Sequence, residues 1–159
     1  LSPPRLGGGS ERAVPAFRPP LIPVAAAWAE VPVVALAPPV APVFTQHYEY
    51  RSPAGGFAAD DGFIRERAPL PRLDAPALIG RLDAWWPTLF SLDGTPRPVA
   101  TISFAAQILV DPATLPPAEP LRYRARMAAL HDGFFVGLRE LWRVDRIVAF
   151  NQQTFYILR

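Results

Sequence analysis

Two residue types that often carry catalysis or bind metals, cysteine and histidine, are absent or rare in this sequence. It has no cysteine, which excludes disulfides, thiolate metal sites and cysteine nucleophiles. It has only two histidines, His47 and His131, so we expect no histidine-based zinc site. We also expect no cofactor. A Ser-His-Asp triad is allowed by count, but the G-x-S-x-G turn that presents a serine nucleophile is absent. Carboxylates, hydroxyls and amides are therefore the groups to weigh.

Two polar residues stand within apolar patterns. Asp83 flanks the apolar stripe of a helical segment, and Gln153 shares a strand face with Ala149 and Phe155. An amide among apolar neighbours needs hydrogen-bond partners. The adjacent Gln152 points to the opposite face, so a register shift of one residue would exchange the two amides. A surface ion pair for the acid and a bridge between strands for the amide remain open as structural roles.

Length and composition indicate one folded domain. The chain has 159 residues, half of them hydrophobic, and a formal charge of +2 in which every basic residue is arginine. With no basic cluster interleaved with aromatic residues, we expect no nucleic-acid partner. The chain begins at Leu1, not Met, so we interpret it as either processed or a fragment of something longer. No cleavable signal peptide is visible, and we expect a cytoplasmic protein.

The first part of the chain differs from the rest. Residues 1–42 contain ten prolines, which fix φ and remove amide donors, so this segment favours extended chain. Prolines also interrupt the apolar stretch Leu21–Phe44, which excludes a helix that spans a membrane. Because the segment is apolar, we expect a strap between modules that packs on a folded body. We assign residues 1–42 to this strap and 43–159 to the domain.

Periodicity predicts the elements of the domain. Asp74–Trp86 is a helix, with Asp74 as its cap and with apolar residues at helical spacing. The expected strands are Phe44–Arg51, Gly62–Arg67, Val99–Val110, Leu121–Leu130, Phe134–Arg143 and Arg146–Leu158. A single helix can bury its apolar stripe only if the sheet curls around it. The order therefore predicts an α+β hot-dog fold, a curled antiparallel sheet wrapped around one main helix.

Several stretches resemble the acyl-CoA thioesterase II (TesB-like) family. That family ends in a pattern of the kind E-x-W/Y-x-x-x-G-x-L-V-A-x-x-x-Q. In this sequence the corresponding residues are Glu140, Trp142, Asp145, Ile147, Val148, Ala149 and Gln153. Arg146 departs from the pattern, since the family often has glycine in that turn. The segments Phe44–Arg51, Leu82–Pro87 and Pro98–Phe104 are also similar. The resemblance covers residues 40–159 and implies the C-terminal half of a double hot-dog protein.

The resemblance implies a hydrolytic site. In the family a carboxylate, a hydroxyl and an amide activate water, and the matching positions here are Asp83, Thr101 and Gln153. Such groups suit thioester hydrolysis, which needs a base and donors around the water. From the residues alone, Thr101 fits equally well as a plain strand residue, and Ser103, placed on the same face by alternation, could replace its hydroxyl.

Three further sets of residues could belong to a functional site, but each also has a structural explanation. Arg122, Arg124 and Arg126 form a row that could attract the phosphates of coenzyme A, but a solvated strand face explains them as well. The side chains of Trp85, Trp86 and Phe90 could line an acyl tunnel or fill the core. His131 belongs to a turn more naturally than to a site.

The resemblance implies a first function and leaves two alternatives. The first is hydrolysis of acyl-CoA to free fatty acid and CoA. The alternatives are a non-catalytic acyl-CoA-binding module and a structural module that completes a catalytic partner. In each case we expect a second hot-dog module or a homodimer to pair with the open sheet edge, and no membrane partner.

Overall fold

The structure is a computed structural model, and it describes residues 28–36, 38–39 and 41–158. The strands are β1 (Val33–Val34), β2 (Tyr48–Arg51), β3 (Asp61–Glu66), β4 (Val99–Ile108), β5 (Leu121–His131), β6 (Phe134–Arg143) and β7 (Arg146–Ile157). The α-helix is α1 (Ala75–Asp83). Short 3-10 helices span Trp28–Glu30, Val43–His47, Gly56–Ala58, Thr88–Leu92 and Pro112–Thr114.

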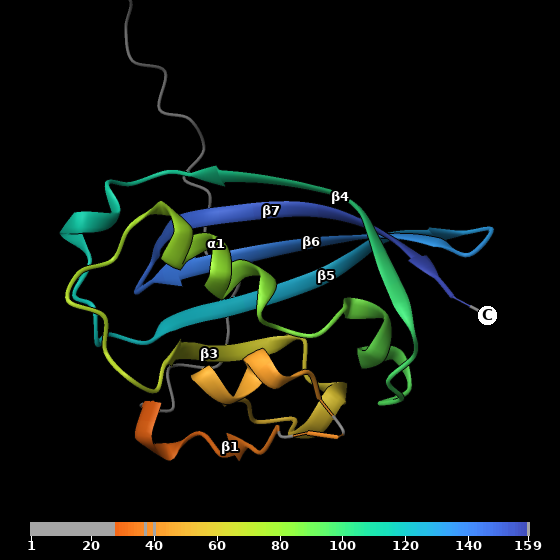
Figure 1. Ribbon diagram of the computed structural model, residues 1–159, viewed down its shortest axis with the longest axis horizontal. Helices are drawn as coiled ribbons and strands as arrows, with labels where there is room; N and C mark the ends of the chain where they lie inside the picture. Colours follow the sequence, from red (N-terminus) through yellow and green to blue (C-terminus); the bar gives the residue numbers. More distant parts are fainter. Residues whose placement is uncertain (1–27, 37, 40, 159) are drawn as a thin grey trace, which may run out of the picture.

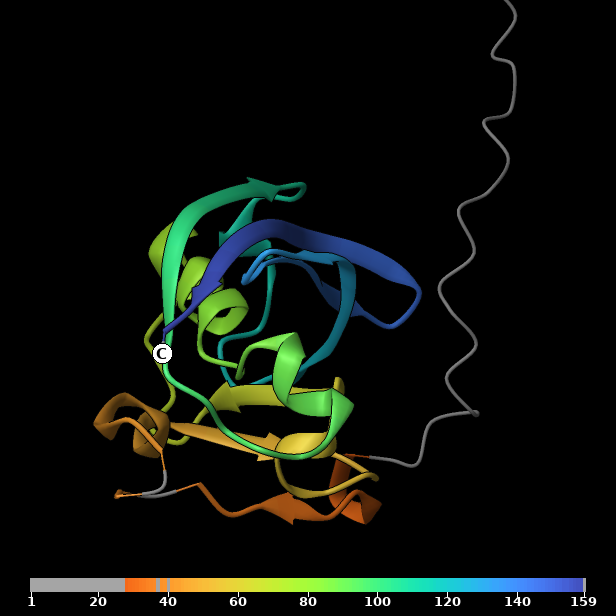
Figure 2. The same cartoon turned by 90° about the vertical axis from the view of Figure 1, so that its right-hand side faces the viewer.

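All seven strands form one antiparallel sheet in the order β1-β2-β3-β5-β6-β7-β4. The sheet curls over α1, which lies across its concave face (Figures 1 and 2). The turn into β6 requires backbone that glycine adopts easily, with φ of 48° at Asp132 and 80° at Gly133. This arrangement is the α+β hot-dog fold that the sequence predicts.

The helix begins as expected and ends earlier. Asp74 caps it, since its Oδ1 accepts a hydrogen bond from the amide of Ala77 at 2.9 Å. The helix ends at Asp83, before the predicted end at Trp86, and Ala84 is its C-cap. Pro87, which has no amide proton, prevents any later continuation of the helix. Trp85 is nevertheless buried, stacked on Tyr123 with ring centroids 4.5 Å apart.

The sequence also placed the first strand too early. Residues Val43–His47 form a 3-10 helix, and β2 begins only at Tyr48. A local hydrogen bond from the Thr45 hydroxyl to the Pro42 carbonyl, 2.7 Å long, closes this turn and competes with extended backbone. The strap adds the short strand β1, which pairs with β2 and which the sequence did not predict.

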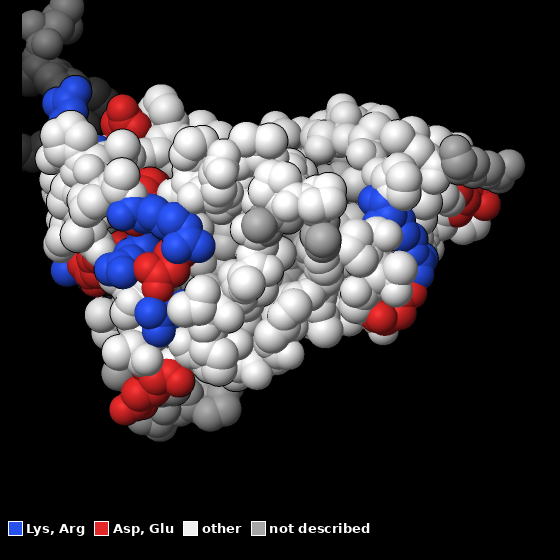
Figure 3. Space-filling view, turned by 60° about the horizontal axis from the view of Figure 1, so that its bottom comes forward, with Lys and Arg blue, Asp and Glu red and all other residues white. Residues whose placement is uncertain are grey.

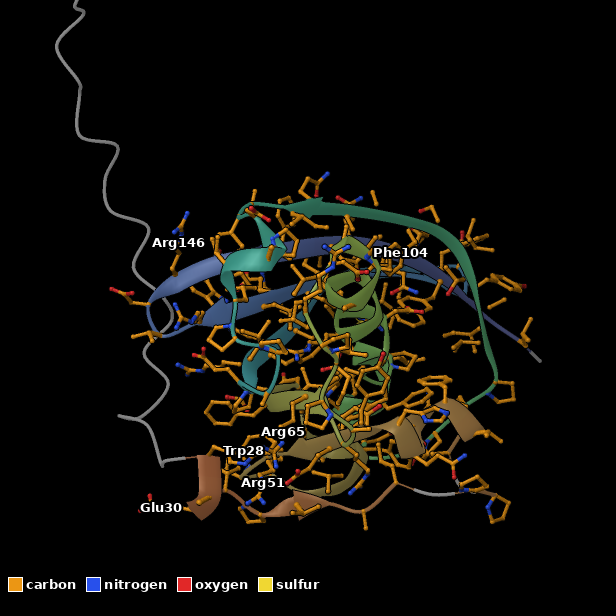
Figure 4. The ribbon with its side chains drawn as sticks, turned by 60° about the vertical axis from the view of Figure 1, so that its left-hand side comes forward. Trp28, Glu30, Arg51, Arg65, Phe104 and Arg146 are labelled. Carbon is orange, nitrogen blue, oxygen red and sulfur yellow. The ribbon has the colours of Figure 1, made fainter. Side chains whose placement is uncertain are left out.

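Trp28 anchors the described part of the strap to the outer face of the sheet. The guanidinium groups of Arg51 and Arg65 lie 4.6 and 4.7 Å from the centre of its ring, and Phe63 meets the ring edge-on. Figure 4 shows Trp28, Arg51 and Arg65 grouped on this side of the molecule. Glu49 accepts hydrogen bonds from both arginines. In Figure 3 charged side chains gather toward the two ends of the face, with an uncharged area between.

Glu49 should make the stability of the protein depend on pH. Burial alone would raise the pKa of Glu49, but hydrogen bonds from Arg65 and Arg51 outweigh burial and hold this pKa below its usual value of 4.5. A depressed carboxyl pKa contributes stability that is present above the unfolded pKa and lost as the pH falls through the folded pKa. We therefore expect Glu49→Gln to lower the free energy of unfolding at pH 7 and to flatten its decline below pH 4.5.

Urea denaturation at pH 7 and in the acid range measures both effects. Asp145→Asn, at an exposed carboxyl in the β6–β7 turn, is the matched control and should leave the pH profile unchanged. Parallel pH profiles for Glu49→Gln and the unmodified protein would contradict the expectation.

Candidate active site

A cavity of about 490 Å³ opens beside the end of α1. Its volume lies within the range of small-molecule sites, about 300–1,000 Å³. The strap, the segment after α1 and the inner faces of three strands enclose it. Its lining residues include Leu36, Ala41, Phe57, Asp83, Trp85, Trp86, Phe90, Thr101, Arg139, Gln153 and Phe155. The cavity is therefore mostly apolar, with polar groups gathered where α1 meets the sheet.

Asp83, Thr101 and Gln153, the three residues implied by the resemblance, meet through the side-chain amide of Gln153. Gln153 Nε2 donates hydrogen bonds to Asp83 Oδ1 at 3.2 Å and to Thr101 Oγ1 at 2.9 Å. The three residues are far apart in sequence, with 70 and 52 positions separating Gln153 from its two partners. The structure thus brings all three together, in the wall of the cavity.

The hydrogen bonds leave defined groups available to a ligand. An ionised carboxylate only accepts, so the NH₂ side of the Gln153 amide must face Asp83. Thr101 Oγ1 accepts from the same NH₂, which leaves the threonine hydroxyl hydrogen to be donated elsewhere. The Asp83 side chain is 57% exposed and hence reachable. A water beside this group could donate to Asp83 and accept from Thr101.

Three different elements position these side chains. Asp83 is the last residue of α1, Thr101 lies in β4, and Gln153 faces inward from β7. Gln153 is 2% exposed, whereas Gln152 is exposed on the other face. The alternation of β7 therefore decides which of the two amides enters the cavity.

A bulge in β4 corrects the prediction for Ser103. Thr101 pairs with Phe155 and Ser103 with Thr154, so one extra residue lies in β4 between these pairs. The extra residue reverses the alternation, which turns Ser103 outward while Phe104 packs against the core (Figure 4). Ser103 is not on the face of Thr101, and it does not line the cavity.

Arg139 is a residue of the site that the sequence reasoning missed. Its side chain is 2% exposed, and its Nη1 lies 3.5 Å from Asp83 Oδ1. It also donates a hydrogen bond to the Leu82 carbonyl at 3.2 Å. The signal was present in the alternation of β6, in which Phe135 and Leu141 point inward and place residue 139 on the same face.

The remaining candidates lie outside the polar group. Arg122 and Arg124 are half-buried and Arg126 is exposed on the outer side of β5, while Tyr123 and Ala125 between them are buried. His131 is 88% exposed and contacts Asp132 in the turn. Arg146, the departure from the terminal pattern, is exposed at the start of β7 (Figure 4).

The aromatic candidates lie between the cavity and the core. Trp85, Trp86 and Phe90 belong to the core and also line the cavity, so an acyl tunnel there stays a prediction. Among the described residues, no three His, Asp or Glu side chains meet as a metal site would require.

The comparison with known protein families shows the family of this chain. The family described as "Acyl-CoA thioesterase C-terminal domain" matches residues 18–157. The chain belongs to this family. The match begins within the strap, upstream of the boundary at residue 43 that the sequence suggested. No curated protein matches the chain.

Solved structures agree on the fold of this thioesterase-family chain. A conserved protein of unknown function with a hot-dog fold from Alicyclobacillus acidocaldarius is 25% identical, with a TM-score of 0.70 over 96% of this chain and 57% of that one. A putative thioesterase II from Thermobifida fusca YX is 20% identical, with a TM-score of 0.59 over 87% and 56%. An acyl-CoA thioesterase II, TesB2, from Mycobacterium marinum is 20% identical, with a TM-score of 0.51 over 80% and 56%. The chain thus spans little more than half the length of these structures.

No helix in the described residues is long and apolar enough to cross a membrane.

Proposed function

We propose that this chain takes part in the hydrolysis of acyl-CoA thioesters to free fatty acid and CoA. The observation that carries the proposal is the Gln153 amide, which holds Asp83 and Thr101 together in the wall of an apolar cavity. Membership of the thioesterase family supports the same reaction. The proposed site uses a carboxylate, a hydroxyl and an amide, and it requires neither a covalent intermediate nor a cofactor.

The reaction would run through a water between Asp83 and Thr101. Asp83 takes a proton from the water, and the oxygen attacks the thioester carbonyl carbon. The hydroxyl of Thr101 and the amide of Gln153 orient the water and the base. The tetrahedral intermediate then collapses, the carbon–sulfur bond breaks, and the proton on Asp83 passes to the leaving thiolate. The carboxylate is thereby restored.

Release of free CoA from acyl-CoAs tests the proposal. Purified full-length protein should release CoA from at least one substrate in a series from acetyl-CoA to palmitoyl-CoA. The series should be followed with a thiol reagent. No release from any member would reject hydrolysis, and binding of a non-hydrolysable analogue without turnover would select an acyl-CoA-binding module instead.

The strap should limit the length of the acyl group. Ala41, which is 6% exposed, belongs to the strap and lines the cavity, and a larger side chain there would occupy space that an acyl chain would fill. We expect Ala41→Phe to lower kcat/KM for the longest accepted acyl-CoA by about tenfold or more, since a few lost methylene contacts are worth about 1–3 kcal/mol.

The control for this variant is the shortest accepted substrate, whose kcat/KM should change by less than about twofold. Ala54→Phe, at an exposed position outside the cavity, is the matched substitution and should leave the length profile unchanged. An equal loss for short and long substrates in Ala41→Phe would count against a length-limiting role of the strap.

One observation favours a structural role as the second candidate. Strand β4 lies at the edge of the sheet, and Ile102 on this strand is 59% exposed. An open edge with apolar side chains is suited to pairing with another chain or module. We therefore propose a second hot-dog module or a second copy of the chain as the partner at β4. Activity of the full-length protein that survives substitution of Asp83, Thr101 and Gln153 together would select the structural role.

A further inference from the structure

Arg139 is a charged side chain in a place where charge is costly. Its side chain is 2% exposed, although removing a cation from water is expensive unless partners compensate. The partners are few: the Leu82 carbonyl, the Asp83 carboxylate, and the face of Phe155 at 5.3 Å from the guanidinium carbon. Nε has no hydrogen-bond partner among the described residues. An apolar side chain of similar volume would serve packing at least as well.

Arg139 and Gln153 both approach the same oxygen atom of Asp83. Nη1 of Arg139 lies 3.5 Å from Oδ1, and Nε2 of Gln153 lies 3.2 Å from the same oxygen. The hydrogen bond from Gln153 and the nearby positive charge of Arg139 together hold the carboxylate by Oδ1 and leave Oδ2 to face a ligand. Without them, the exposed side chain of Asp83 would be free to turn toward solvent.

The position of Asp83 in the helix makes such support necessary. Asp83 is the last residue of α1, where the helix dipole disfavours a negative charge. Arg139 offsets this penalty in two ways, since it binds the carboxylate and also the carbonyl of Leu82 in the same last turn. A cation at the end of a helix is favourable by the same physics.

We propose that Arg139 is a positioning residue, which holds the Asp83 carboxylate against Gln153 with one oxygen free to accept a proton from water. This role rests on the proposed hydrolysis. Arg139 acts through Asp83, so its removal should slow turnover and leave substrate binding almost intact.

Steady-state kinetics of the full-length protein tests the role. We expect Arg139→Met to lower kcat by about 100-fold, the scale of a misplaced catalytic group, with KM changed by less than about threefold. Arg139→Lys restores a cation and should recover about tenfold of that loss. In an Asp83→Asn background, Arg139→Met should cause no further loss, because the carboxylate that it positions is gone. A kcat within about twofold of the unmodified protein, or the same loss with and without Asp83, would overturn the role.

Thermal unfolding of the same variants keeps the test independent of activity. If the unmodified protein hydrolyses no acyl-CoA, the proposed function fails, and the coupling between Arg139 and Asp83 is still measurable. The melting shifts of Arg139→Met and Asp83→Asn should be non-additive in the double variant. Additive shifts would show that the two side chains do not act together. If Arg139→Met does not fold, Arg139→Lys takes its place in both the kinetic and the thermal measurements. The kcat of Arg139→Lys is then compared directly with the kcat of the unmodified protein.

Discussion

Asp83→Asn should reduce acyl-CoA turnover by about 10²- to 10⁴-fold, the usual contribution of a positioned general base. The substitution keeps the shape of the side chain and an oxygen that can accept the hydrogen bond from Gln153. It removes the group that takes the proton from water. Release of CoA under saturating substrate measures the loss in kcat.

The same variant should remain almost as stable as the unmodified protein. The side chain of Asp83 is 57% exposed and its contact with Arg139 is long, so the ion pair contributes no more than about 1 kcal/mol, and Arg139 keeps its hydrogen bond to the Leu82 carbonyl in the variant. Asp145→Asn makes the same chemical change at an exposed turn and should leave both turnover and melting temperature unchanged. Full activity in Asp83→Asn would remove this residue from the site.

Arg81→Met should destabilise the protein by about 3–5 kcal/mol, the cost of removing one partner of a buried ion pair. Arg81 is fully buried in α1, and its Nη2 lies 2.5 Å from Glu66 Oε2 on β3. Its other donors bind the carbonyls of Glu119 and Pro117, each at 3.1 Å. One side chain thus ties the helix to a strand and to the loop before β5, and the variant leaves a carboxylate and two carbonyls unpaired.

Chemical denaturation measures this loss as a shift of the unfolding midpoint at unchanged slope. Arg72→Met, at an exposed position just before the helix, is the matched control and should change stability by less than about 0.5 kcal/mol. The double variant Arg81→Met with Glu66→Leu should recover part of the loss, because no buried charge is left unpaired. A loss in the double variant equal to the sum of the single losses would show that burial of the unpaired carboxylate is not the cause.

The spacing of apolar residues along the sequence was enough to predict the fold. Apolar residues at helical spacing with Asp74 as a cap predicted α1, and strict alternation predicted β5, with Tyr123 inward and Arg124 outward. One helix facing several strands then required a curled sheet. The errors fell at boundaries, where a proline or a local hydrogen bond decides the backbone, as at Thr45 and Trp86.

The spacing of residues along the sequence did not always predict the face of the sheet on which a site residue lies. Alternation alone put Ser103 beside Thr101, and the bulge between them reversed it. A bulge depends on how β4 fits against β7, a contact between segments about fifty residues apart, and it leaves no clear mark in either segment. Arg139 is a different case: the alternation of β6 already points it inward, but its contact with Asp83 joins a strand to an earlier helix and does not follow from the strand pattern.

The sequence by itself determined that one helix is wrapped by an antiparallel sheet, and it supplied an acid, a hydroxyl and an amide at positions typical of a thioesterase. Only the tertiary structure decided that a single amide, Gln153, binds both Asp83 and Thr101, that the strap closes a wall of the cavity, and that a buried arginine lies beside the acid. The physical reason is that periodicity is set by neighbours along the chain. Hydrogen bonds in the site join residues 52 and 70 positions apart and depend on how the sheet curls.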